Sequence, residues 1–277
     1  MHFDSFNISY GATEDFYDAT GSDALLTAQH ADLVDLQVAN CWPFVSSGDS
    51  GAFPPGSQFL EDGEVTVQYP ASDDHVIAVG GTTASSKSPT IIARNKELGW
   101  GGSGGGSGKF ALPPWQVGFP GLESTSHRNV PDVAFDSDPN TGYNIVFTPP
   151  GMAQGAFIVG GTSAAAPTWA ATLALVQQMR VALGKAALKL VGAKPYAAST
   201  AGNFFDVTIG DNSFYANKVG YDAVTGVGSR MPSGLDLPRR HNPPNVTVMG
   251  AALAVPKFFV HSKRTSFKRW FSLFPTI

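Results

Sequence analysis

The chain has 277 residues and a formal net charge of −4, and 43% of its residues are hydrophobic. That length suits one large domain or two small ones, and the hydrophobic content excludes a disordered chain. The one cysteine, Cys41, excludes an intrachain disulfide and a zinc site built from several cysteines. No apolar run reaches the roughly 18 residues of a membrane span, and the N-terminus lacks the pattern of a signal peptide.

Charge is distributed unevenly along the chain. Residues 239–277 contain seven Lys or Arg residues and no Asp or Glu, which leaves 11 basic and 22 acidic residues in the first 238. A body this acidic is not expected to bind nucleic acid. We predict a domain over 1–238 and a basic, aromatic-containing tail of unknown structure over 239–277. The tail is either a segment that binds a membrane surface or a partner, or read-through from a wrong gene boundary. The second interpretation is favoured, so membrane contact is not expected.

The first elements in chain order predict a parallel sheet. Residues 6–10 predict a short strand, and Gly11 ends it. Residues 22–39 carry an apolar stripe at helical spacing, and residues 42–45 form the next apolar run. Strand, helix and strand over about 40 residues indicate a βαβ unit, whose two strands run parallel.

The later elements continue this α/β pattern. Residues 76–81 and 157–161 predict two more short strands. Residues 162–183, rich in Ala and Leu, predict a long helix that tolerates Pro167 because proline fits the first turns of a helix. Residues 99–108 are nearly all Gly and Ser, so they are either a linker or a place where backbone approaches something closely.

Ser163 lies where a predicted strand meets a predicted helix, within the run GGTSAAAP over residues 160–167. The unpaired N–H groups at a helix start stabilise developing negative charge, which suits a nucleophile. The alternative is an ordinary Ser or Thr N-cap. The three alanines after the serine favour the nucleophile, because a substrate that approaches closely needs small neighbours.

Asp49 lies in a second run of small residues, SSGDSG over 46–51, directly after a predicted strand. This aspartate is either a buried acid that faces the same cleft as Ser163 or a side-chain cap within a turn. A third pattern is FDV over 205–207, followed by GYDAVTG over 220–226. Its two carboxylates, with glycines and carbonyls between them, are hard oxygen ligands of the kind that Ca²⁺ takes. The alternative is a pair of Asx-turns within a loop.

Together these three runs resemble the sedolisin family of serine-carboxyl peptidases, acid-active relatives of subtilisin. GGTSAAAP resembles the nucleophile motif of that family, SSGDSG its oxyanion-hole loop, and FDV with GYDAVTG its calcium loop. The segments YPAS (69–72), VGGTT (79–83) and RNVPDVA (128–134) fit as well, in family order over roughly residues 5–236. The resemblance implies a subtilisin-like parallel sheet flanked by helices, with the N-terminal part of the domain missing.

The resemblance also implies a role for each matching residue. Ser163 is the nucleophile, and Asp49 stabilises the oxyanion together with the Ser163 backbone N–H. An aspartate donates a hydrogen bond only when protonated, which requires acidic pH or a pKa raised by burial. The implied substrate-binding residues are Ser9, Tyr10 and Gly11 on an edge strand and Ser103, Gly104 and Gly105 on a second wall of the cleft.

One calcium ion is the implied cofactor. Its ligands are the side chains of Asp206 and Asp222 and the carbonyls of Val207 and Gly220. Lys218 stands where the family usually has a glycine, so its carbonyl is a further ligand only if the backbone there adopts the required angles.

The catalytic base of the family is a Glu-x-x-x-Asp pair that precedes the strand beginning here at Phe6, and we expect this chain to start too late to contain it. Glu14 and Asp18 match the spacing but follow Ser9 to Gly11, so a surface loop is predicted for them. The six histidines form no spaced pair and are expected to be ordinary surface or core residues.

Two hypotheses follow for the function. The first is a serine-type endopeptidase that acts on peptide or protein substrates at acidic pH, with a propeptide in a full-length parent and secretion as in the family. The second is an inactive remnant, or a protein that only binds, because it lacks the Glu/Asp base pair. Loss of such a base lowers activity by several orders of magnitude.

Overall fold

The computed structural model describes residues 5–19, 21, 23–54, 64–84, 97–151, 153–189 and 191–230. The chain divides into two units, residues 1–237 and 238–277, and the described residues all belong to the first. The tail predicted over 239–277 therefore lies outside the described residues. Within the described part of the chain, no helix has both the length and the apolar content needed to cross a membrane.

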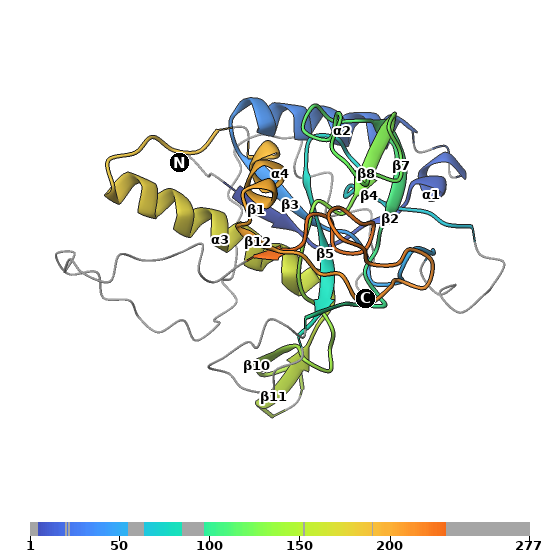
Figure 1. Cartoon of the computed structure of the whole chain (residues 1–277). Coiled ribbons are helices and arrows are strands. Elements are labelled where there is room, and N and C mark those ends of the chain that lie inside the picture. The colour runs from blue at the N-terminus through green and yellow to red at the C-terminus, as the bar shows by residue number, and fades with distance from the viewer. Residues whose placement is uncertain are drawn as a thin grey trace. The chain divides into compact units, whose positions relative to one another are not determined.

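A seven-stranded sheet forms the centre of the first unit (Figure 1). The strand order is β1-β3-β5-β9-β13-β12, and β6 pairs with β5. Neighbours from β1 to β13 run parallel, whereas β12 and β6 are antiparallel to their partners. The strands are β1 (Ser5–Ile8), β3 (Trp42–Ser46), β5 (Ile77–Thr83), β6 (Leu98–Gly99), β9 (Val133–Asp136), β12 (Phe204–Phe205) and β13 (Ser229–Arg230).

Three two-stranded sheets and four helices complete the described elements. The small sheets are β2 (Ala12–Thr13) with β4 (Gln68–Tyr69), β7 (Gly106–Ala111) with β8 (His127–Val130), and β10 (Tyr143–Phe147) with β11 (Gly155–Val159). The helices are α1 (Glu14–Ala19), α2 (Asp23–Val38), α3 (Thr162–Ala182) and α4 (Ala193–Thr200).

Helices cover both faces of the main sheet (Figure 1). On one face Trp169 of α3 packs in a core that includes Phe44 and Val79. On the other face Leu33 of α2 packs in a core that includes Val45. Successive strand residues point to opposite faces of a sheet, so β3 contributes Phe44 to one layer and Val45 to the other. Strands buried on both faces read as continuous apolar runs, which explains the pattern at residues 42–45.

The predictions for the regular elements are confirmed. The predicted helices are α2, over 22–39, and α3, over 162–183. The predicted strands over 42–45, 76–81 and 157–161 are β3, β5 and β11. The strand predicted over 6–10 is β1, which ends at Ile8 and not at Gly11. The parallel pairing of β1 with β3 confirms the βαβ unit. β11 pairs antiparallel with β10, and Figure 1 shows this hairpin extending away from the main sheet.

The Gly/Ser segment over 99–108 is a place of close backbone approach and not a linker. The N–H of Gly104 donates to the carbonyl of Gly48 at 3.0 Å. A Cβ atom on Gly104 would overlap the carbonyl oxygen of Ser47, and one on Gly105 would overlap that of Ala223. Glycine is therefore required at both positions, because no side chain fits between these backbone segments.

A buried ion pair joins β8 to the start of β9. The side chains of Arg128 and Asp132 are paired and almost fully buried. Asp132 also accepts the N–H of Ala78 at 2.7 Å and the hydroxyl of Tyr196 at 2.8 Å. Burial raises the pKa of Tyr196 well above its usual value, so this hydroxyl stays a donor. The network fixes the turn between β8 and β9 against the neighbouring strand β5.

Candidate active site

Ser163 is the second residue of α3, and its side chain is exposed. Gly161 is the N-cap, with a φ of 90° that favours glycine, and no side chain caps the helix start from that position. Thr162 and Ser163 are thus inside the helix, so the ordinary N-cap alternative is wrong. The N–H of Ser163 belongs to the first turn, where an α-helix offers no carbonyl to accept it. The backbone N–H and the hydroxyl of Ser163 therefore both lie at the positive end of the helix dipole.

The alanines after Ser163 have a different role from the predicted one. Ala165 and Ala166 are fully buried and belong to the core that includes Phe44. Their small size allows α3 to approach the sheet closely and leaves no space for a substrate. The prediction is therefore wrong for these two residues, while Ala164 is partly exposed.

Asp49 follows β3 and reaches across to the start of α3. Its Oδ1 accepts the backbone N–H of Thr162 at 2.7 Å and the Thr162 hydroxyl at 2.8 Å. The same hydroxyl accepts the N–H of Gly48 at 3.1 Å, which ties the two loops together. Asp49 is therefore a side-chain cap, which was the second alternative. It caps the start of α3, 113 residues away in sequence, and not the turn in which it lies. It is exposed and not buried.

The second carboxylate oxygen of Asp49 has a different environment. Oδ2 lies over Gly161, where a Cβ atom would be 2.5 Å from it. Oδ1 accepts two hydrogen bonds from Thr162, whereas Oδ2 accepts none from the described residues. Sequence reasoning missed the roles of Gly161 and Thr162. The sequence signal that could have indicated these roles is the position of both residues directly before Ser163 in the run GGTSAAAP.

The predicted substrate strand lies next to Ser163. Ser9, Tyr10 and Gly11 follow β1 and are exposed, and β1 is an edge of the described sheet. The hydroxyl of Ser9 donates to the carbonyl of Ser163 at 3.1 Å. An edge strand carries unpaired backbone groups, with which an extended peptide can pair.

The other predicted wall, Ser103 to Gly105, is buried. The Ser103 hydroxyl accepts the N–H of Gly81 at 2.8 Å and donates to the carbonyl of Val224 at 2.6 Å. The structure thus uses this hydroxyl to join β5 to the loop around Val224. Only the backbone of the segment approaches the loop that carries Asp49.

The predicted calcium ligands lie in one loop region. Asp206 accepts the N–H of Gly220 at 2.9 Å. The amide nitrogen of Asn217 lies 3.0 Å from the Val207 carbonyl and 3.1 Å from Asp222 Oδ2, so these two oxygens converge. The chemistry of this donor set, two carboxylates and carbonyl oxygens, fits Ca²⁺.

Two details of this loop bear on the expected ligands. Asp222 is fully buried and accepts the N–H groups of Val224 and Thr225 at 3.0 and 2.8 Å, which is the Asx-turn geometry of the alternative. Burial raises its pKa. Gly220 has a φ of 85°, whereas Lys218 does not have a positive φ. The Lys218 ammonium pairs with Glu123 at 2.7 Å.

Glu14 does not lie in a surface loop, so that prediction is wrong. It begins α1 and is 4% exposed, and its carboxylate accepts the N–H of Lys109 at 2.9 and 3.2 Å. Desolvation raises the pKa of Glu14. Among the described residues, no carboxylate hydrogen-bonds to the Ser163 hydroxyl.

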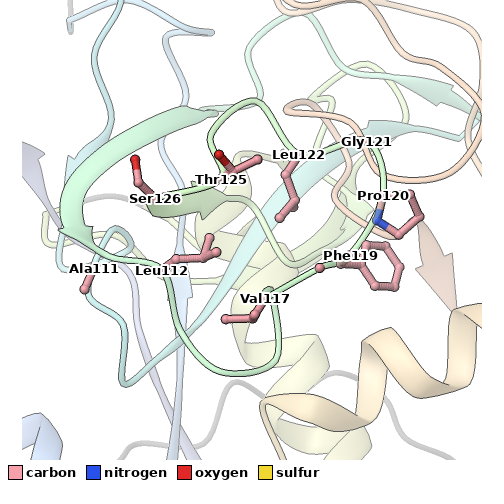
Figure 2. Close-up of a pocket in the computed structure, with 10 residues that line it drawn as sticks. Ala111, Leu112, Val117, Phe119, Pro120, Gly121, Leu122, Thr125 and Ser126 are labelled. Atoms are coloured by element: carbon pink, nitrogen blue, oxygen red, sulfur yellow. The ribbon is translucent and has the colours of Figure 1, made fainter.

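A hollow of about 610 Å³ lies in the loop between β7 and β8 and is lined mainly by apolar residues that include Leu112, Phe119 and Leu122. Figure 2 shows these side chains around the hollow, with the hydroxyls of Thr125 and Ser126 at one end. Neither Ser163 nor Asp49 lines it, so it is not part of the candidate active site.

A parallel sheet between two helix layers, with Ser163 and Asp49 at one helix start, is typical of a subtilisin-like fold. Residues 1–191 match the Subtilase family. The chain is 32% identical to kumamolisin of Bacillus sp. (strain MN-32) over 252 residues, which are 83% of this chain and 41% of that protein. It is 29% identical to human tripeptidyl-peptidase 1 over 245 residues, or 80% of this chain and 40% of that protein.

Among solved structures, a Pseudomonas sedolisin, titled a serine-carboxyl proteinase complexed with two molecules of pseudo-iodotyrostatin, matches with a TM-score of 0.68 and 29% identity. The match covers 82% of this chain and 62% of that one. The chain belongs to the subtilase family and, within it, to the sedolisins. It spans 30–41% of the length of the relatives kumamolisin, xanthomonalisin and sedolisin.

Proposed function

We propose that the protein is a serine-type endopeptidase that cleaves peptide bonds at acidic pH, with Ser163 as its nucleophile. The observation that carries the proposal is the link from Asp49 through Thr162 to the start of α3. It holds the Asp49 carboxylate at the N-terminus of the helix whose second residue is Ser163. The sedolisin relatives support the same class of reaction.

In this mechanism the Ser163 hydroxyl attacks the peptide carbonyl carbon while a base takes its proton. The carbonyl oxygen becomes an oxyanion, which the Ser163 N–H and the protonated Oδ2 of Asp49 stabilise. The intermediate collapses, the amine leaves with the proton, and water then hydrolyses the acyl-enzyme. Acid is needed because only a protonated carboxyl donates a hydrogen bond. We assign the extended substrate backbone to the edge at Ser9, Tyr10 and Gly11, opposite the backbone of Ser103 to Gly105.

The general base decides between the peptidase and the second candidate, a protein that binds peptides without cleaving them. This candidate is favoured by one observation: no carboxylate among the described residues reaches the Ser163 hydroxyl. We therefore assay two forms, the 277-residue chain and the longest product that its natural transcript encodes. Cleavage of a fluorogenic peptide library is followed from acidic to neutral pH, and peptide binding is measured beside it.

Ser163→Ala should lower cleavage by roughly 10³–10⁶-fold, while Ser126→Ala, at an exposed serine of another loop, should not change it. Asp49→Ala should cost about 100–1000-fold. Asp49→Asn carries a donor at every pH, so its activity should persist at higher pH than that of the unchanged protein. Full activity of Ser163→Ala would contradict the nucleophile. Peptide binding without cleavage in both forms would establish the second candidate.

We also propose that one Ca²⁺ ion stabilises the loop that contains Asp206 and Asp222. The side chains of these two aspartates and the carbonyls of Val207 and Gly220 would hold it, whereas Lys218 is left out because its φ is not positive. A bound ion adds stability only to the folded state, so EDTA should lower the Tm of the unchanged protein and added Ca²⁺ should restore it. Asp206→Asn should lose most of this response, whereas Asp211→Asn, in the same loop, should keep it. An equal response in both variants would contradict the site.

The acid requirement of the proposed activity favours action outside the cytoplasm, and we propose secretion of the protein with a propeptide in its precursor. Detection of the protein in culture medium, and not in cell extract, tests this proposal.

A further inference from the structure

Two histidines and two aspartates converge at the amino end of β5. Asp73, Asp74 and His75 precede β5, and His30 lies in the middle of α2. One side-chain N or O atom from each residue lies within 4.8 Å of the others. Asp49 instead follows β3, which runs parallel to β5, so this cluster lies at the amino ends of the strands and the candidate active site at their carboxyl ends.

The distances within this His/Asp cluster suit one small metal ion. His30 Nδ1 lies 2.8 Å from Asp73 Oδ2 and 3.8 Å from Asp74 Oδ1. His75 Nδ1 lies 2.8 Å from Asp74 Oδ1 and 3.5 Å from Asp73 Oδ1. A tetrahedral zinc site with bonds of about 2.0–2.1 Å has ligand atoms about 3.4 Å apart. The two shortest distances are hydrogen bonds, and the four ligand atoms all lie within 4.8 Å of one another, so zinc binding requires rotation of these side chains and release of any Nδ1 proton.

The supporting contacts hold the ligands in place. Asp73 is fully buried and accepts the backbone N–H of His75 at 2.8 Å. The Asp73 carbonyl accepts Nε of Arg128 at 3.2 Å, and the Asp73 N–H donates to the carbonyl of Pro70 at 3.1 Å. Such contacts orient the side chains that bind a metal ion directly. The side chains of His30, Asp74 and His75 are 21–33% exposed, so an ion from solvent can reach the cluster.

Charge favours a divalent cation here. Among the described residues, the ion pairs of Asp73 and Asp74 are with His30 and His75. With neutral imidazoles the cluster carries a charge of −2, which one divalent ion cancels. Imidazole nitrogen with carboxylate oxygen suits Zn²⁺ better than the all-oxygen sites that Ca²⁺ and Mg²⁺ prefer. Sequence reasoning missed this pairing because His30 and His75 are far apart in the chain and approach only when α2 packs beside β5.

We propose that His30, Asp73, Asp74 and His75 bind one Zn²⁺ ion that joins α2 to the segment entering β5. Four protein ligands fill a tetrahedral site and leave no open position for substrate, which is typical of structural zinc. The site does not depend on the proposed peptidase activity. It forms between residues of the domain that are remote from Ser163.

The test measures zinc on the full chain at near-neutral pH, in excess Ca²⁺ so that calcium-binding loops are occupied. Isothermal titration with ZnCl₂ and metal analysis after dialysis should give one Zn²⁺ per chain, and Zn²⁺ should raise the Tm. His75→Gln should weaken binding at least about tenfold and lose the rise in Tm. His127→Gln is the matched control, because His127 lies outside the cluster beside the Ser126 hydroxyl.

Asp74→Asn gives a second variant in case His75→Gln does not fold, since Asp74 is partly exposed and its amide is isosteric. This variant should also lose zinc while keeping the circular dichroism of the unchanged protein. Co²⁺ in place of Zn²⁺ should give the intense visible bands of a tetrahedral complex. Absence of stoichiometric zinc, or equal zinc binding in His75→Gln, Asp74→Asn and His127→Gln, would overturn the proposal.

Discussion

Asp49 and Asp132 both lie in short connections next to strands of the main sheet, but their surroundings differ. Asp132 is 1% exposed and is paired with Arg128, and its two oxygens also accept bonds from Ala78 and Tyr196. Asp49 is exposed, and the bonds it accepts, from Thr162, all go to Oδ1. Both oxygens of Asp132 are thus engaged by neighbouring groups, whereas Oδ2 of Asp49 accepts no hydrogen bond from the described residues.

This difference separates a structural acid from an acid suited to catalysis. A buried carboxylate with every lone pair engaged cannot take part in a reaction without breaking the fold. A carboxylate that is held by one oxygen has a fixed position and a second oxygen that no described residue engages. Both aspartates lie within motifs of the sedolisin resemblance, so the motif alone does not separate the two roles. The two roles are separated by the number of hydrogen bonds that each carboxylate accepts.

The largest expected effect concerns the buried pair. Asp132→Ala leaves the guanidinium of Arg128 buried and unpaired, so the free energy of unfolding should fall by about 3–5 kcal/mol. Asp49→Ala removes a helix cap, which costs about 1 kcal/mol. Urea denaturation of the two variants measures both values. The double variant Arg128→Met with Asp132→Leu removes both charges and should recover most of the loss. Equal destabilisation by the two alanine variants would contradict the conclusion that Asp132 supports the fold more than Asp49 does.

A smaller loss of stability is expected from a substitution at Gly161, the residue that lies next to Oδ2 of Asp49. Gly161→Ala should cost about 1–3 kcal/mol, because its φ of 90° is unfavourable for alanine. It should also lower the proposed peptidase activity, since the new Cβ would lie 2.5 Å from Asp49 Oδ2 and displace it. Gly202→Ala is the control, with a φ of 71° and no atom within 4 Å of its Cβ. Comparable activity in the two variants would show that the position of Oδ2 is unimportant.

Much of the fold could be predicted from the sequence, because each main element has a local signal. The apolar runs at 42–45 and 76–81 are strands of the sheet that are buried on both faces. The apolar stripe over 22–39 belongs to α2, the helix that covers one face of this sheet. The Gly/Ser segment left two alternatives open, and local sequence could not choose between them. The choice depends on Ser47 and Ala223, which lie far away in the chain.

The site could be predicted in part. The run around Ser163 indicated the helix start, but the alanines that follow it serve the core, since helix periodicity turns two of them toward the sheet. The bond from Asp49 to Thr162 joins residues 113 apart, and the convergence of His30 with His75 requires α2 to pack on the sheet. Such contacts are products of topology and leave no trace in local spacing.

Glu14 offers the smallest and most specific test of burial, because the sequence places it in a surface loop and the structure places it inside. Desolvation raises its pKa, so the folded protein binds this proton more tightly than the unfolded chain does. Its contribution to stability is therefore greatest below the unfolded pKa and is lost as pH rises through the folded value. Glu14→Gln has no such proton, and its stability should fall less than that of the unchanged protein as pH rises from acidic to neutral. Urea denaturation across that range measures the two slopes, with Glu123→Gln, at a more exposed glutamate, as control. If the free energy of unfolding changed equally with pH in Glu14→Gln and in the unchanged protein, the burial of Glu14 would be contradicted.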